Sequence, residues 1–133
     1  MFHLSRRSRT RLNGVEPILI EIIEDSLKVS PYDFGIPRYG GLRSESDQNE
    51  LYAQGRTAPG NIITHIDGTI RKSYHQTGKA FDVFGYVNGK ATWDEDILTA
   101  IAETIIDVSD SKGICIQWGG HWKRFKDLPH YQI

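Results

Sequence analysis

The stretch Ser73-Tyr74-His75-Gln76-Thr77-Gly78-Lys79-Ala80-Phe81-Asp82 joins a polar turn to the start of a strand. Alternate side chains of a strand share one face, so Ala80 and Asp82 should point the same way. Gly78 would let the backbone turn and bring His75 back toward Asp82. Histidine nitrogen and aspartate oxygen both suit zinc. This stretch therefore predicts two metal ligands at a sheet.

A catalytic zinc ion needs a third protein ligand and one open position for water. That ligand should be another histidine, and His130 is favoured because Asp127 precedes it by three residues and Pro129 fixes the turn between them. Such spacing could place a metal ligand and a general base at one site. Asp82 could instead cap a turn. The other candidate histidines are His3, His65 and His121.

Three segments have helical patterns. Apolar residues recur on one face from about Val15 to Lys28 and again from Asp94 to about Val108. Between them, Ser44 resembles an N-cap that opens a helix running through Gln54. Residues 1–12 precede the first pattern, and we expect them to form a loose arm.

Strand signals fall mainly in the second half of the chain. Ala80 to Val87 predicts one strand, and Asn88-Gly89 is a strong hairpin signal. Ile114 to Trp118 predicts a buried strand that would also bury Cys115. Phe34 to Tyr39 could be a short strand, whereas residues 56–79 form a long irregular stretch.

Composition limits the fold and the partners. The 133 residues are 38% hydrophobic and 25% charged, and the net charge of -1 gives no reason to expect nucleic acid as a partner. One cysteine excludes an internal disulfide, and no apolar run is long enough for stable membrane insertion. We expect a monomeric α+β domain over residues 1–133. It should have a short, mostly antiparallel sheet, about three helices packed around it and a zinc site at the sheet.

Two motifs carry a resemblance to a known family. The pattern Ser-x-His-x-x-Gly-x-Ala-x-Asp and the later Asp-x-Pro-His resemble zinc peptidases related to D-alanyl-D-alanine carboxypeptidases and dipeptidases. Within that group, the chain is most similar to phage endolysins that are L-alanyl-D-glutamate endopeptidases. The stretches that look like this subgroup are Asp33-Phe34-Gly35, Gly41-Leu42-Arg43, Leu51 to Thr57, Pro59-Gly60 and Trp118-Gly119-Gly120.

The resemblance implies a role for five residues. His75, Asp82 and His130 would hold one zinc ion (Zn2+), and Asp127 would be the general base and acid. Arg43 matches an arginine near the substrate carbonyl, where a guanidinium could stabilise an oxyanion. A structural ion pair is an equally good interpretation of Arg43.

Four further positions bear on this resemblance. Ser73 and Gln48 match recurring family positions, although Gln48 fits a solvated helix residue better. Gln117 and His121 stand where relatives often carry Arg and Asp. These departures affect the expected substrate recognition rather than the metal ligands, and His121 remains an alternative proton-transfer residue.

The implied activity is hydrolysis of the L-alanyl-D-glutamate bond in the peptidoglycan stem peptide. Two alternatives remain: a D,D-carboxypeptidase that releases terminal D-alanine, and a zinc-bearing binding module without turnover. Asp127 and Arg43 argue against the second, because a purely structural metal needs neither. No signal peptide and no cell-wall-binding domain are recognised, so we expect the enzyme to stay in the host cytoplasm until lysis. It would then reach the wall through a pore made by another protein.

Overall fold

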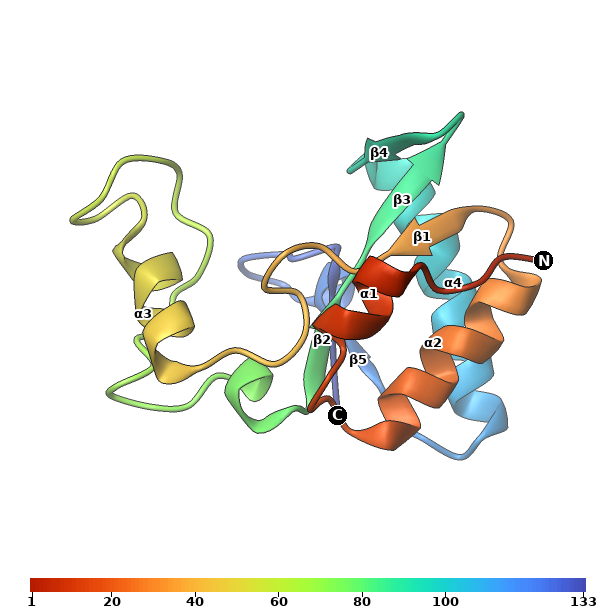
Figure 1. Cartoon of the computed structure of the whole chain (residues 1–133), viewed down its shortest axis with the longest axis horizontal. Helices are drawn as coiled ribbons and strands as arrows, with labels where there is room; N and C mark the ends of the chain where they lie inside the picture. The colour runs from red at the N-terminus through yellow and green to blue at the C-terminus, as the bar shows by residue number, and fades with distance from the viewer.

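The computed structural model describes all 133 residues as a small α+β fold (Figure 1). Its helices are α1 (Arg6–Arg11), α2 (Pro17–Val29), α3 (Glu45–Ala53) and α4 (Glu95–Ser111), with short 3-10 helices η1 (Tyr74–Thr77) and η2 (Gly119–His121). Its strands are β1 (Asp33–Gly35), β2 (Ala80–Asp82), β3 (Phe84–Val87), β4 (Lys90–Thr92), β5 (Gln117–Trp118) and β6 (His130–Gln132). They form two antiparallel three-stranded sheets, ordered β1-β3-β4 and β2-β6-β5. The mostly antiparallel α+β prediction is confirmed, with four α-helices where about three were expected.

The core lies between the sheets and the pair α2 and α4, which run side by side (Figure 1). Their inward stripes are fully buried, as Ile22 and Ile23 on α2 and Ile101 and Ile105 on α4 illustrate. Asp94 caps α4 by accepting hydrogen bonds from the first-turn amides. Both long helical predictions are therefore confirmed. None of the helices has the length and apolar character needed to cross a membrane.

The predicted single strand from Ala80 to Val87 is wrong, because the chain changes sheets at Val83. The segment before Val83 pairs with β6, whereas the segment after it pairs with β1 and β4. Val83 itself is fully buried and donates its amide to the Pro129 carbonyl. The hairpin prediction holds, since Asn88 and Gly89 have φ of 52° and 74° and join β3 to β4.

The N-terminal arm is ordered, which corrects the prediction of a loose segment over residues 1–12. Ser5 caps α1 by accepting a hydrogen bond from the Ser8 amide, and Leu12 is 1% exposed in the core. The hydroxyl of Ser8 is buried and accepts a hydrogen bond from the Ile36 amide. The N-terminal arm therefore packs against β1. Its arginine-rich composition gave no indication of this contact.

The predicted buried strand over Ile114 to Trp118 is correct only in its last two residues. The strand β5 begins at Gln117, and Cys115 is exposed. Burial of Cys115 was therefore a wrong expectation. The apolar neighbours Ile114 and Ile116 do pack against the core. The apolar run therefore predicted the contacts of these two residues correctly and the burial of Cys115 incorrectly.

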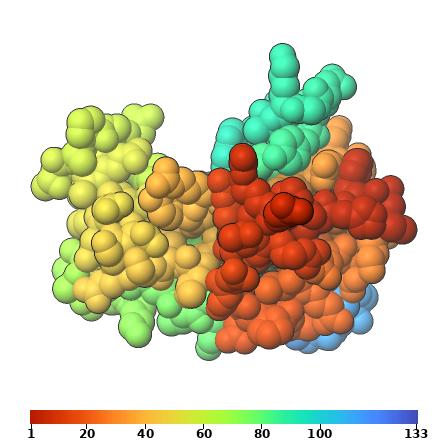
Figure 2. Space-filling model, in the orientation of Figure 1, coloured from red at the N-terminus to blue at the C-terminus, as the bar shows by residue number.

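The helix α3 and the irregular residues that follow it form a lobe beside the rest of the molecule (Figure 1). Ser44 and Asp47 make a reciprocal capping box at the start of α3, as the sequence indicated. Residues 56–73 contain no helix or strand, in agreement with the predicted irregular stretch. Figure 2 shows a notch in the surface between this lobe and the β3–β4 hairpin.

Candidate metal centre

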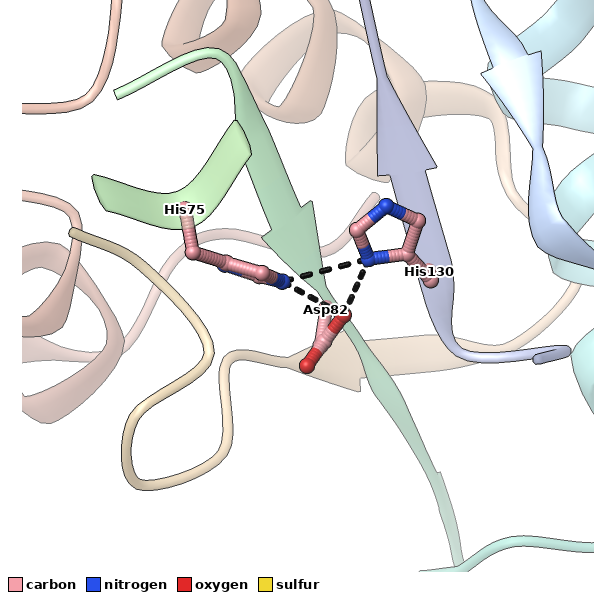
Figure 3. A group of neighbouring side chains, drawn as sticks. All are labelled: His75, Asp82 and His130. Atoms are coloured by element: carbon pink, nitrogen blue, oxygen red, sulfur yellow. Dashed lines mark hydrogen bonds and ion pairs between the residues drawn. The ribbon is translucent and has the colours of Figure 1, made fainter. Parts of the chain in front are cut away.

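Three side chains from separate elements converge at one point (Figure 3). Asp82 and His130 face each other because they are paired residues of β2 and β6. His75 lies on η1, whose C-cap is Gly78 with φ of 75°. Nδ1 of His130 lies 3.1 Å from both Nε2 of His75 and Oδ1 of Asp82. The turn and strand alternation expected from this stretch thus produce the cluster.

Hydrogen bonds behind the two rings hold their protons away from the centre. Nδ1 of His75 lies 2.9 Å from the Gly41 carbonyl, and Nε2 of His130 lies 2.7 Å from Oε1 of Gln132. Both oxygens only accept, so in neutral rings these nitrogens carry the hydrogens. The opposite nitrogens then face Asp82 as free lone pairs.

This arrangement fits a metal cation. Three donor atoms, two nitrogens and one carboxylate oxygen, lie within 4.8 Å of one another. Without a cation or an added proton between them, their lone pairs repel. Two histidines and one carboxylate suit zinc and leave a position for water, and the hydrogen bonds behind the rings are the support that metal-binding histidines usually have. His75, Asp82 and His130 could therefore hold a metal ion.

The charges around the centre favour ionised Asp82. Burial alone would raise the pKa of Asp82, but the adjacent His75 and His130 hold it well below its usual range. Burial also tends to lower the pKa of His130, yet its hydrogen bond to Asp82 and the Asp82 charge raise it overall. The ionised Asp82 therefore stabilises positive charge at this centre.

Asp127 is brought beside this centre by the turn that precedes β6. Its carbonyl accepts a hydrogen bond from the His130 amide, and Nε1 of Trp118 donates to the Leu128 carbonyl at 2.7 Å. Burial raises the pKa of the Asp127 carboxyl, and the nearby Asp82 charge adds to this effect. The charges of His130, His75 and Arg43 act in the opposite direction and lower the same pKa.

Gly119 lets the Asp127 segment approach η2, and its replacement should displace the carboxylate. A Cβ at Gly119 would overlap the Asp127 carbonyl oxygen. We expect Gly119→Ala to lower turnover by about tenfold or more, since a misplacement of roughly 1 Å can cost about 100-fold. Zinc content should change little because the three ligands are untouched. Steady-state kinetics together with metal analysis of the same sample checks this prediction.

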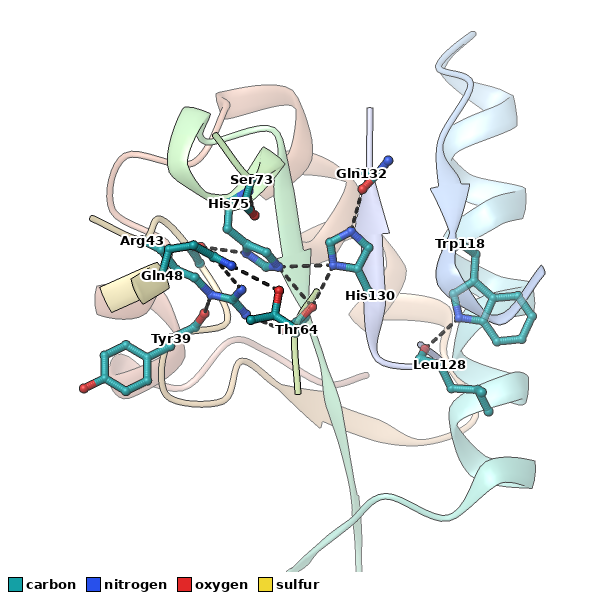
Figure 4. A network of polar contacts seen from close by, with 12 residues as sticks. Tyr39, Arg43, Gln48, Thr64, Ser73, His75, Trp118, Leu128, His130 and Gln132 are labelled. Carbon is teal, nitrogen blue, oxygen red and sulfur yellow. Dashed lines mark hydrogen bonds and ion pairs between the residues drawn. The ribbon is translucent and has the colours of Figure 1, made fainter. Parts of the chain in front are cut away.

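Arg43 forms the ion pair that the sequence left as one of two interpretations. Its Nη2 lies 3.1 Å from Oδ2 of Asp82, and its Nε donates to the Tyr39 carbonyl at 2.7 Å (Figure 4). Its Nη1 donates to Oε1 of Gln48 at 3.1 Å. Arg43 thus holds the Asp82 oxygen that faces away from the two histidines. A contact with a substrate carbonyl remains a prediction.

Gln48 is fully buried, so its interpretation as a solvated helix residue is wrong. Besides accepting from Arg43, its amide donates to Oγ1 of Thr64 at 3.1 Å and to the Ile66 carbonyl at 2.9 Å. The loop that buries Gln48 has no periodic pattern, and α3 itself has no apolar stripe. Only its match to a recurring family position indicated a role at the site.

The irregular stretch after α3 borders the segment that carries Asp127. The ring of His65 packs on Phe125, with 4.1 Å between ring centroids. His65 therefore contacts the segment that carries Asp127 but lies outside the metal cluster. His3 and His121 are exposed and also lie outside the cluster, and His121 packs against Trp118. Of the candidate histidines, the structure brings only His130 to His75 and Asp82.

Comparisons with known proteins agree with one another. A family described as phage L-alanyl-D-glutamate peptidase matches residues 1–132. The peptidoglycan L-alanyl-D-glutamate endopeptidase CwlK of Bacillus subtilis (strain 168) is 36% identical over 126 residues, which cover 82% of this chain and 68% of CwlK. The L-alanyl-D-glutamate peptidase of Escherichia phage T5 is 28% identical over 127 residues, covering 95% of this chain and 85% of the relative. The crystal structure of the Serratia marcescens L-Ala D-Glu endopeptidase ChiX matches with a TM-score of 0.80 and 33% identity, covering 99% of this chain and 90% of ChiX.

Proposed function

This chain belongs to the phage L-alanyl-D-glutamate peptidase family, and we propose that it hydrolyses the L-alanyl-D-glutamate bond of the peptidoglycan stem peptide. The observation that carries this proposal is the cluster of the buried His75 and His130 with the half-buried Asp82, beside which the Asp127 carboxyl lies. A peptidase of this kind needs a metal site and a nearby proton acceptor, and the described contacts supply both.

We propose that the resident metal is zinc, held by Nε2 of His75, Oδ1 of Asp82 and Nδ1 of His130. These are the three atoms that the surrounding hydrogen bonds leave facing one another. When bound, zinc supplies a Lewis acid that makes water nucleophilic at neutral pH and polarises a carbonyl. The half-buried Asp82, already ionised beside the histidines and Arg43, needs no proton loss before binding the ion.

The proton transfers are assigned to Asp127. Its carboxylate accepts a proton from the attacking water and then donates it to the leaving amine of D-glutamate. Burial and the Asp82 charge raise the pKa of Asp127, which strengthens it as a base and makes it a usable acid in the second step. Asp82 cannot take this role while it is held by Arg43 and the two histidines.

Replacement of Arg43 should separate its two proposed roles. We expect Arg43→Ala to lower the rate at saturating substrate by about 10²–10³, the usual cost of one oxyanion-stabilising donor. The loss should persist at saturating zinc, and Arg43→Lys should recover only part of it because lysine lacks the forked geometry. If added zinc fully restored the rate of Arg43→Ala, the only role of Arg43 would be its ion pair with Asp82, which supports metal binding. Rates measured across a zinc titration decide between these outcomes.

Digestion of purified peptidoglycan tests the bond. We expect new amino-terminal D-glutamate, identified by mass spectrometry, and L-alanine left on the glycan. Release of free D-alanine with L-alanyl-D-glutamate intact would show the D,D-carboxypeptidase alternative, and zinc binding without new ends would show the silent binding module. A D,D-carboxypeptidase would need a cation to hold the free terminal carboxylate of its substrate. Arg56 is disfavoured for this role, since it donates to the Tyr52 and Thr64 carbonyls and stacks on the Tyr52 ring.

The route to the wall is also a proposal. We propose a monomer that stays in the host cytoplasm until lysis and then passes a pore made by another protein. Its substrate partner is the stem peptide, and it binds no nucleic acid. Fractionation of infected or expressing cells, with and without a pore-forming lysis protein, tests this route. Wall degradation without such a pore would contradict it.

A further inference from the structure

Two glutamines behind His130 are arranged by the sheet register. Strand β6 lies between β2 and β5, and His130 and Gln132 share one face because they are two residues apart. Gln132 is the direct cross-strand partner of Gln117 on β5 and of Ala80 on β2. Ala80 has no polar side-chain atom, so Gln117 is the cross-strand neighbour that can bond to the Gln132 side chain.

These residues form a continuous chain of hydrogen bonds. Nε2 of His130 lies 2.7 Å from Oε1 of Gln132 (Figure 4). Nε2 of Gln132 in turn donates to Oε1 of Gln117 at 3.1 Å. Each amide has one accepting and one donating end. Gln132 therefore presents its oxygen to the ring while its NH2 group donates to Gln117, which favours this orientation of the amide.

The chain of amides can also run in the opposite direction. If both amides turned over, Gln132 would donate to Nε2 of His130, and the ring hydrogen would move to Nδ1. That hydrogen would then lie between His130 and Asp82, where the lone pair is needed for a metal. The direction of the amides thus decides whether Nδ1 of His130 is available.

We propose that Gln132 and Gln117 are positioning residues that hold His130 in the tautomer whose Nδ1 lone pair faces the metal centre. The inference rests on the proposed zinc site and extends it to two residues outside the ligand set. Gln117 is exposed and Gln132 is half-buried, so neither is required for the core, and substitutions at both should fold. A carboxylate at either position accepts only, which fixes the direction seen here, whereas a lysine only donates.

Gln132 variants test the first step through zinc affinity, measured by competition of zinc alone with a chromophoric chelator. We expect Gln132→Leu to bind zinc about 10–100-fold more weakly, the usual cost of losing a hydrogen bond behind a metal-binding histidine. Gln132→Glu should bind at least as tightly as the unaltered protein. Equal affinities of the unaltered protein and Gln132→Leu would overturn the proposal.

Gln117 variants separate hydrogen-bond direction from charge. Zinc affinity should fall in the order Gln117→Glu, unaltered protein, Gln117→Met, Gln117→Lys. Methionine is neutral and similar in length, so a purely electrostatic effect predicts that Gln117→Met equals the unaltered protein. That equality would remove Gln117 from the proposal.

The tautomer itself is a readout that a merely structural role would not change. Long-range ¹H–¹⁵N spectra of the metal-free protein, recorded at a pH at which the His130 ring is neutral, should show its hydrogen on Nε2 in the unaltered protein and in Gln132→Glu. In Gln132→Leu the signals should move toward the other tautomer, and an unchanged Nε2–H would contradict the inference. Failure of the unaltered protein to bind zinc would instead refute the proposed function, so the two failures are distinguishable.

Discussion

Asp127→Asn is expected to lower turnover by about 10²–10⁴ while the protein keeps its zinc and its fold. The amide has nearly the same shape as the carboxyl but cannot accept the proton of the attacking water. The backbone bonds that fix the turn, from Asp127 to Gly119 and from His130 to Asp127, do not involve the side chain. The structural cost should therefore be small, and the loss should fall on kcat.

Steady-state kinetics on zinc-loaded protein, with metal content measured on the same sample, checks this result. His121→Gln is the matched control, because His121 is exposed and lies outside the metal cluster. Near-normal turnover of Asp127→Asn combined with a large loss in His121→Gln would move the proton transfer to His121. Near-normal turnover of both would require a base elsewhere.

His75→Ala should abolish zinc binding at micromolar metal and with it all measurable hydrolysis. The variant removes one of three donors and leaves the half-buried Asp82 with one fewer cationic or hydrogen-bonding partner. Chelation of the unaltered protein should have the same effect on activity, and added zinc should reverse it. The variant should remain folded, since the apolar core between α2, α4 and the sheets does not include His75.

Metal analysis, hydrolysis and thermal unfolding of the same preparation check this prediction. His65→Ala is the control: His65 packs on Phe125 outside the cluster, so its zinc content should be unchanged. Unchanged zinc in His75→Ala would remove His75 from the ligand set. Loss of cooperative unfolding in His75→Ala would instead show that the cluster is needed for the fold.

The sequence by itself determined the features whose causes lie within a few residues. The periodic apolar residues of α2 and α4, the capping box at Ser44 and the hairpin at Asn88-Gly89 are all local. The ligand cluster was also foreseeable, although its third member needed the family resemblance. His75 and Asp82 lie on one turn and the following strand, and only His130 comes from a distant segment.

The tertiary structure decided the features that depend on distant partners. Residues 80–87 read as one strand because each residue suits a strand, but hydrogen bonds to β6 on one side and β1 on the other divide them at Val83. Likewise, nothing near Gln48 in the sequence predicts its burial, which comes from a loop 16 to 18 residues away.

The same reason explains why the supports of the metal centre could not be read from the sequence. Arg43 and Asp82 are 39 residues apart, and Gln117 and Gln132 are 15 apart. The patterns of helices and strands reflect neighbours along the chain, whereas hydrogen bonds behind a site depend on which strands pair and in which register. The ligand types were therefore visible in the sequence, and the contacts that orient them appeared only in the folded chain.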